Sequence, residues 1–157
     1  MSSDNPGVII RPPFLYLGTL LIAAVLDWFV PASFGGILPA IAWVQIAGVA
    51  VTLAGGGIMA LAVRRFSHAG TNVPTNLPVT ALVTDGLYGL SRNPIYVGMS
   101  ALYIGLSLLF DNPWALAFLI PILLVMRIGV IAREERYLEH KFGEAYTTYK
   151  AKVRRWL

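Results

Sequence analysis

Four long apolar stretches limit what this chain can fold into. They cover residues 13–30, 37–63, 94–110 and 113–132 and together take up about half of the 157 positions. An apolar helix needs about 20 residues to cross a hydrocarbon core about 30 Å thick, and each stretch is close to that length. We therefore expect an all-α integral membrane protein with about four transmembrane helices.

The overall composition agrees with a membrane protein. Hydrophobic residues make up 57% of the chain and charged residues only 13%, whereas about a quarter of a soluble domain is charged. Once four spans are subtracted, too few residues remain for a separate soluble domain. We expect one membrane-embedded domain over residues 1–157. No cationic region and cleavage site precede the first stretch, so we expect it to be retained as an anchor.

Some kinds of site are excluded by composition. The chain has no cysteine, which rules out disulfides and thiolate metal sites. Its two histidines are too few for a convincing metal centre, so no metal is expected. The net charge of +4 follows from the position of the loops, and we expect no nucleic-acid partner.

The charged residues predict how the chain crosses the membrane. Turn-forming residues separate the first two stretches and the last two, so each pair is expected to form a tight hairpin. Every Lys and Arg lies at Arg11, within 64–92, or from Arg127 onward. By the positive-inside rule, both termini and the loop 64–93 are expected on the cytoplasmic side.

Two further segments have simple structural interpretations. Residues 133–157 carry aromatic and apolar residues at mostly helical spacing between basic ones, which predicts a cytoplasmic amphipathic helix on the membrane surface. The run Gly55, Gly56 and Gly57 follows no strand and precedes no lysine. It therefore favours close helix packing over a phosphate-binding loop.

Arg127 interrupts the last apolar stretch. Only 15 residues separate it from Asp111, which corresponds to about 22 Å of helix and places it below the membrane surface. It either extends toward the headgroups or faces an internal polar cavity. Glu134 and Glu135 follow two helical turns later on the same face, so the three side chains could line one polar pocket.

The loop 64–93 is longer than most connections, and loops of this kind are often functional. It ends with Arg92 and Asn93 beside Pro94, which can begin the third helix. A helix N-terminus with a nearby arginine suits a carboxylate or phosphate. These residues also fit a simple interfacial anchor with a capped helix.

Several of these elements resemble one known superfamily. They are LVTDGLY at 82–88, SRNPIYVG at 91–98, Gly105, REE at 133–135, Leu138, Phe142, Gly143, Tyr146 and Tyr149. In this order and spacing they are similar to the C-terminal core of the isoprenylcysteine carboxyl methyltransferase and phospholipid methyltransferase superfamily. The resemblance covers roughly residues 66–155.

The resemblance implies S-adenosylmethionine as methyl donor, bound at the cytoplasmic ends of the last two spans, and a lipophilic acceptor that enters from the lipid bilayer. The residues it places around the cofactor are Leu82, Val83, Tyr88, Arg92, Asn93, Pro94, Tyr96 and Gly98. It places Glu134 and Glu135 near the amino acid end of the cofactor or the reacting centre. With Arg127, they are the candidate catalytic residues. Many members have His where this chain has Asn93, so a general base at that position is not essential here.

The leading hypothesis is S-adenosylmethionine-dependent methyl transfer to a prenylcysteine-like carboxylate or a phospholipid amine. A small hydrophobic thiol or acid is a further possible acceptor. A carboxylate acceptor needs no proton removed, whereas an amine needs a group such as Glu134 or Glu135 to accept one. The alternative is a non-enzymatic four-span membrane assembly or transport partner. A haem or quinone protein is disfavoured because neither histidine lies within a span.

Overall fold

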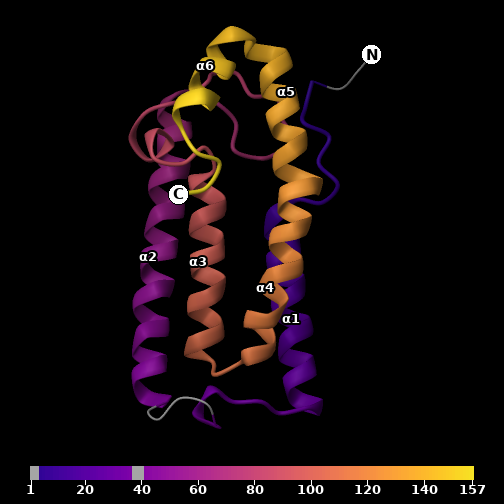
Figure 1. Ribbon diagram of the computed structural model, residues 1–157, viewed down its shortest axis with the longest axis vertical. Helices are drawn as coiled ribbons and strands as arrows, with labels where there is room; N and C mark the ends of the chain where they lie inside the picture. Colours follow the sequence, from indigo (N-terminus) through magenta and orange to yellow (C-terminus); the bar gives the residue numbers. More distant parts are fainter. Residues whose placement is uncertain (1–3, 37–40) are drawn as a thin grey trace.

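The computed structural model describes residues 4–36 and 41–157, and within these ranges the chain is helical with no strand. The main helices are α1 (Pro12–Phe29), α2 (Ile41–His68), α3 (Pro94–Leu109), α4 (Pro113–Val125), α5 (Ala132–Phe142) and α6 (Glu144–Lys152). A π-helix, η3 (Met126–Ile131), joins α4 to α5, and the short 3₁₀ helices are η1 (Phe34–Gly36) and η2 (Gly86–Gly89). Figure 1 shows α1 to α4 as roughly parallel rods, with α5 extending α4 and α6 above them.

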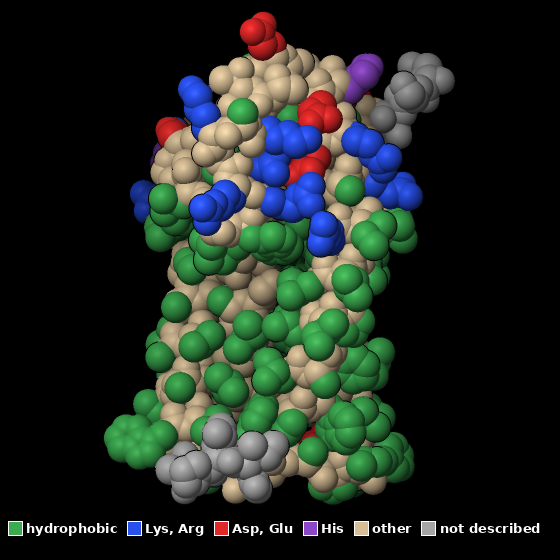
Figure 2. Space-filling model, in the orientation of Figure 1, with side chains coloured by type: hydrophobic (Ala, Val, Ile, Leu, Met, Phe, Trp, Pro, Cys, Tyr) green, Lys and Arg blue, Asp and Glu red, His purple; other side chains and the backbone are tan. Residues whose placement is uncertain are grey.

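The helices confirm that this is an integral membrane protein. Within the described residues, α1, α2 and the continuous helix Pro113–Phe142 are long and apolar enough to cross a membrane. The remaining predicted span, the third in chain order, is α3, which is apolar but has only 16 residues. Figure 2 shows hydrophobic side chains over the lower part of the molecule and Lys and Arg gathered at the upper end, which we call the charged end.

The helices do not pair as two simple hairpins. The predicted pairing of α3 with α4 is confirmed, because these helices pack together after the turn at Asp111 and Asn112. The predicted first hairpin is wrong, because α2 packs mainly on α3, whereas α1 packs on α4. Figure 1 shows α1 and α2 at opposite edges of the bundle.

Paired glycines explain why α2 prefers α3. Gly48 and Gly55 of α2 face Gly105 and Gly98 of α3, respectively. A Cβ atom added at Gly55 would lie 2.4 Å from the backbone nitrogen of Leu102, so the two helix backbones touch there. Small residues allow this close approach in membrane helices. The packing role predicted for Gly55 is thus confirmed, whereas a Cβ at Gly57 would meet nothing within 4 Å.

The helix that begins with α4 is longer than the predicted span 113–132. Residues 113–142 form one continuous rod, and α5 ends where Gly143 adopts a φ of +53°, a conformation that glycine tolerates. The segment 133–157 is therefore two helices, α5 and α6, followed by a tail that folds back toward α3 (Figure 1). Its location on the cytoplasmic side stays a prediction.

The long loop is folded upon itself. Because α2 continues to His68, the loop begins at residue 69 and includes η2. The buried Thr71 hydroxyl accepts a hydrogen bond from the backbone nitrogen of Thr80 (3.0 Å), and Asn72 Nδ2 donates to the carbonyl of Pro78 (2.8 Å). These contacts let the loop cover the charged ends of α2 and α3.

Candidate functional site

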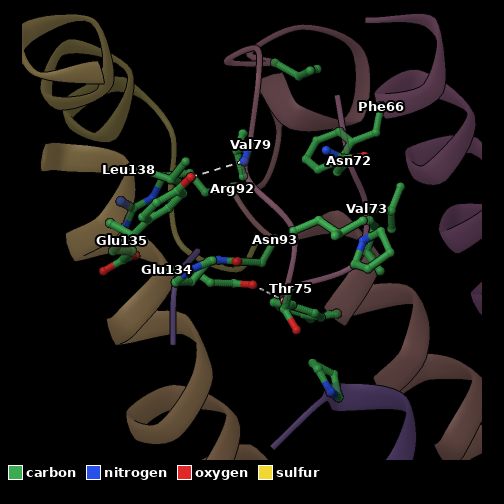
Figure 3. A pocket seen from close by; sticks show the side chains of 18 of the residues that line it. Phe66, Asn72, Val73, Thr75, Val79, Arg92, Asn93, Glu134, Glu135 and Leu138 are labelled. Atoms are coloured by element: carbon green, nitrogen blue, oxygen red, sulfur yellow. Dashed lines mark hydrogen bonds and ion pairs between the residues drawn. The ribbon is translucent and has the colours of Figure 1, made fainter. Parts of the chain in front are cut away.

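A cavity of about 390 Å³ lies at the charged end. Its wall is formed by loop residues between 72 and 83, the start of α3, one side of α5, two tyrosines of α6 and residues 11–14 at the beginning of α1. Figure 3 shows side chains from the loop and from α5 facing each other across this cavity. Segments that are far apart in the sequence thus line one cavity.

Most residues predicted for the site line this cavity. They are Leu82, Val83, Tyr88, Arg92, Asn93, Pro94, Tyr96, Glu134 and Glu135. Gly98 is not among the lining residues. A Cβ at Gly98 would lie 2.8 Å from the carbonyl oxygen of Gly55, so its place in the fold is the contact between α2 and α3.

Arg127 does not join Glu134 and Glu135 in the cavity. Its side chain is exposed on η3, outside the set of lining residues. The expectation of one shared face assumed a regular α-helix, but residues 126–131 form a π-helix, which changes the direction of the side chains that follow. The predicted pocket is therefore present without Arg127.

Glu135 is buried between two arginines. Arg155 donates from Nε to Glu135 Oε1 (2.9 Å) and from Nη2 to Oε2 (2.6 Å), and Arg92 Nη2 lies 3.1 Å from Oε1. The side chains of Arg92 and Glu135 are only 9% and 8% exposed. A buried carboxylate with a two-point arginine contact is held firmly. Glu135 therefore braces the wall of the cavity.

Arg92 keeps hydrogen-bonding capacity for a ligand. Its Nε and Nη1 atoms are buried and have no hydrogen-bond partner among the residues that the structure describes. Buried N–H groups of a charged side chain are costly when they stay unpaired. Because Arg92 also lines the cavity, this arrangement suits an anionic group such as a carboxylate.

Glu134 differs sharply from its neighbour. Among the described residues, one hydroxyl donates to its carboxylate, that of Tyr96 to Oε1 at 2.6 Å, and no salt bridge to Glu134 is formed. Figure 3 shows the Glu134 side chain extending into the cavity. Glu134 can therefore face a cationic or amine group of a ligand, whereas the charge of Glu135 is already balanced by arginines.

Asn93 has a structural partner at the same place. Its Nδ2 donates to the carbonyl oxygen of Arg155 (2.9 Å), and its backbone nitrogen donates to the Ser91 hydroxyl (3.1 Å). The amide thus attaches the C-terminal tail to the start of α3. This contact gives Asn93 a role that needs no ionisable group.

Part of the aromatic wall of the cavity was not predicted from the sequence. Tyr146 and Tyr149 of α6 line the cavity, and the Tyr149 hydroxyl donates to the carbonyl of Tyr88 at 2.7 Å. Burial raises the pKa of Tyr146 to about 12, so it stays protonated at neutral pH. Both tyrosines belong to the elements that carried the family resemblance, which was the available signal. Their spacing was instead interpreted as a membrane-facing stripe.

One residue near the end of α2 and several in the loop were missed for a different reason. Phe66 stacks on Tyr88 with ring centroids 4.8 Å apart, and the lining includes Asn72, Val73 and Thr75. Their positions depend on how the loop folds over α2 and α3, and no local pattern indicates that.

Among residues 4–36 and 41–157, no group of three or more His, Asp or Glu side chains could hold a metal ion.

Comparisons with known proteins identify the family of this chain. Residues 43–145 match the family model described as phospholipid methyltransferase. The protein-S-isoprenylcysteine O-methyltransferase of Xenopus laevis is 33% identical over 159 residues, covering 96% of this chain and 54% of that protein. Its counterpart from Saccharomyces cerevisiae is 40% identical over 72 residues, 46% of this chain and 30% of that protein. The chain thus spans about half the length or less of these relatives.

A solved structure shares the fold. The structure of the eukaryotic intramembrane Ras methyltransferase ICMT (isoprenylcysteine carboxyl methyltransferase) superposes with a TM-score of 0.66 at 22% identity. The match covers 90% of this chain and 50% of that one.

Fold and site together define an integral membrane helical protein with a cavity at the charged end of its bundle. This chain belongs to the phospholipid methyltransferase family, within the superfamily that also contains the isoprenylcysteine carboxyl methyltransferases. The resemblance inferred from the motifs is thereby confirmed.

Proposed function

We propose that this protein transfers a methyl group from S-adenosylmethionine to a lipophilic acceptor. The observation that carries this proposal is that Arg92 and Glu134 line one cavity. Within the described part of the chain, Arg92 has buried N–H groups without a hydrogen-bond partner, and Glu134 forms no salt bridge. S-adenosylmethionine carries a carboxylate and two cationic groups, an ammonium and a sulfonium. Arg92 and Glu134 have the charges that complement these two ends of the molecule.

The residues present fit such a donor. Arg92 would hold its carboxylate, Glu134 would face its cationic groups, and the apolar side chains of Val73, Leu82 and Val83 would contact the adenosine part. Bound there, S-adenosylmethionine would supply a methyl group that is already activated on a sulfonium. The protein then has mainly to align the two reactants and exclude water.

The acceptor side of the cavity is apolar. Pro12, Pro13 and Phe14 at the start of α1, with Ile95 and Met99 of α3, line it, and Phe14 is 63% exposed on the outer surface of the bundle. A lipid-like acceptor could approach from the bilayer through this side. Prenylcysteine-like carboxylates, phospholipid amines and small hydrophobic thiols or acids are the classes that fit.

Glu134 and Tyr96 are the residues proposed to act on the reacting groups. If the acceptor is an amine, the Glu134 carboxylate accepts its proton, and the Tyr96 hydroxyl at 2.6 Å holds the carboxylate in place. If the acceptor is a carboxylate, no proton has to move. Glu134 then serves only to balance the positive charge of the donor.

The orientation of the charged end is also a proposal. Lys and Arg gather there (Figure 2), which supports a cytoplasmic location for both termini and for the cavity. Cysteine substitution at the exposed His140 or Leu157 gives a single reactive thiol in a chain without cysteine. We expect a membrane-impermeant thiol reagent to label either variant only after the cells are opened.

The proposed activity is tested by methyl transfer from S-adenosylmethionine with a labelled methyl group. Detergent-purified protein is incubated with prenylcysteine, phospholipid amine and hydrophobic thiol or acid acceptors in parallel. We expect label in one acceptor class with the wild-type protein and a strong reduction with Glu134→Gln. Donor binding that is absent in the wild-type protein would instead support a non-enzymatic membrane partner.

A further inference from the structure

The C-terminal tail is fastened along the start of α3. Arg92 donates from its backbone nitrogen to the carbonyl of Arg154 (2.9 Å), and Asn93 Nδ2 donates to the carbonyl of Arg155 (2.9 Å). The Ser91 hydroxyl lies 3.4 Å from the same Arg155 oxygen. Figure 1 shows the chain end beside the top of α3. The last residues therefore have a defined place next to the cavity.

Arg155 and Arg92 share one carboxylate unequally. Arg155 occupies both oxygens of Glu135, at 2.9 and 2.6 Å, whereas Arg92 contacts it through Nη2 alone at 3.1 Å. Because Arg155 takes the two-point contact, Arg92 cannot also form it. The result is that Nε and Nη1 of Arg92 stay without a partner among the described residues.

We propose that Arg155 is a positioning residue that keeps Arg92 available to the methyl donor. By occupying both oxygens of Glu135, it prevents Arg92 from turning into a closed pair with that carboxylate. If the Arg155 guanidinium is removed, Arg92 is the one cationic partner that remains for the buried Glu135 carboxylate, and Arg92 is then expected to bind both of its oxygens. The N–H groups of Arg92 would no longer be available to the ligand. This inference rests on the proposed donor binding.

A positioning role of Arg155 can be distinguished from a role in anchoring the tail. If Arg155 only anchored the tail, its loss would weaken the binding of every ligand of the cavity. If Arg155 keeps the N–H groups of Arg92 free, its loss would weaken the binding of only those ligands that have a carboxylate. S-adenosylhomocysteine has this carboxylate, and 5′-methylthioadenosine has the same nucleoside without the amino acid part. The two ligands therefore separate the two roles.

A matched control stands next to Arg155. The Arg154 side chain is exposed and makes no hydrogen bond or salt bridge within the described chain, although its backbone carbonyl holds the tail in the same way. Arg154→Ala removes the same charge and leaves the tail contacts in place. Arg155→Lys keeps the charge but lacks the planar fork that binds both carboxylate oxygens.

The experiment is calorimetric titration of detergent-purified wild-type protein and of the variants Arg155→Ala, Arg155→Lys, Arg154→Ala, Arg92→Ala and the double variant Arg92→Ala/Arg155→Ala. We expect Arg155→Ala to weaken S-adenosylhomocysteine binding roughly ten- to a hundredfold. Binding of 5′-methylthioadenosine should change less than about threefold. The affinity of Arg155→Lys for S-adenosylhomocysteine should lie between those of Arg155→Ala and the wild type, and that of Arg154→Ala should equal the wild-type affinity. In the Arg92→Ala background, Arg155→Ala should add almost nothing.

Each outcome decides a separate point. If the wild-type protein binds neither ligand, the proposed function fails. If the wild type binds and Arg155→Ala behaves like Arg154→Ala, the positioning role is wrong. If binding of both ligands is weakened equally, or if Arg155→Ala causes a full additional loss of affinity in the Arg92→Ala background, Arg155 serves only to anchor the tail.

Thermal unfolding of each variant shows whether it is folded. If Arg155→Ala does not fold, Arg155→Lys decides, and wild-type affinity in that variant would overturn the proposal.

Discussion

In the apolar half of the molecule, α2 and α3 touch backbone to backbone at paired glycines, whereas at the charged end the elements are joined mainly through side chains. The glycine contact leaves no space for an added atom, since a Cβ at Gly105 would lie 2.4 Å from the backbone nitrogen of Thr52. At the charged end, the contacts are hydrogen bonds and ion pairs around a cavity.

This difference between the two regions indicates which substitutions should affect folding and which should affect mainly the site. Substitution in the glycine contact pushes two helices apart and is expected to act on the whole bundle. Substitution of Glu134 or Arg92 removes a group that faces the cavity, and the helices that hold these residues also have other contacts.

The largest effect is expected for Gly55→Leu, with Gly57→Leu as the matched control. A side chain at Gly55 would collide with the backbone of α3, while the corresponding position at Gly57 is open. Overpacking costs about 1–3 kcal/mol in tightly packed interiors and more where backbone must move. We expect Gly55→Leu to lose most folded protein in size-exclusion and thermal unfolding experiments. Similar yields and unfolding temperatures for the two variants would show that the helices are not in close contact.

Glu134→Gln should leave the fold intact and slow methyl transfer. It keeps the shape of the side chain and removes the charge that faces the cavity. We expect about a hundredfold reduction in kcat with an amine acceptor, in the range for loss of a positioned proton acceptor. Glu135→Gln is the comparison, because the same change there leaves two arginines without their carboxylate and should lower the unfolding temperature. Wild-type turnover in Glu134→Gln would remove this residue from the reaction.

The smallest effect is expected for Asp4→Asn at the edge of the charged end. Asp4 accepts hydrogen bonds from Lys141 Nζ (2.7 Å) and the Tyr137 hydroxyl (2.7 Å), and these bonds lower its pKa from the usual 3.8. A carboxyl with a lowered folded-state pKa stabilises the fold above its ordinary pKa and loses that contribution as the pH falls. We expect a slight decrease in unfolding temperature at pH 7, and this difference from the wild type should shrink as the pH falls below the ordinary pKa of 3.8. A difference that persists in acid would mean that the ion pair is not its source.

Much of the membrane half could be predicted because the signal is local. Apolar stretches, turn residues and the packing role of Gly55 are properties of short segments. Which helix packs on which is not local, so the sequence did not indicate that α1 lies against α4. Residues that line the cavity were predicted where a motif contains them, as with Arg92 and Tyr96 at the start of α3.

The remaining errors have identifiable physical causes. Arg127 was expected on the same face as Glu134, but the π-helix between them alters the helical repeat. Arg155 looked like one of several basic residues in a surface segment. Its contact with Glu135 depends on the turn at Gly143 and the return of the tail. Neither feature leaves a periodic pattern that could be recognised from the sequence.

Binding of the methyl donor at Arg92 is the central claim, and calorimetry of the purified protein with two ligands tests it most directly. We expect wild-type protein to bind S-adenosylhomocysteine at least about tenfold more tightly than 5′-methylthioadenosine, because only the former offers a carboxylate to the buried N–H groups. In Arg92→Ala, this difference should nearly disappear while the protein stays folded. Equal affinity of the wild-type protein for both ligands, or an unchanged preference in Arg92→Ala, would contradict the assignment.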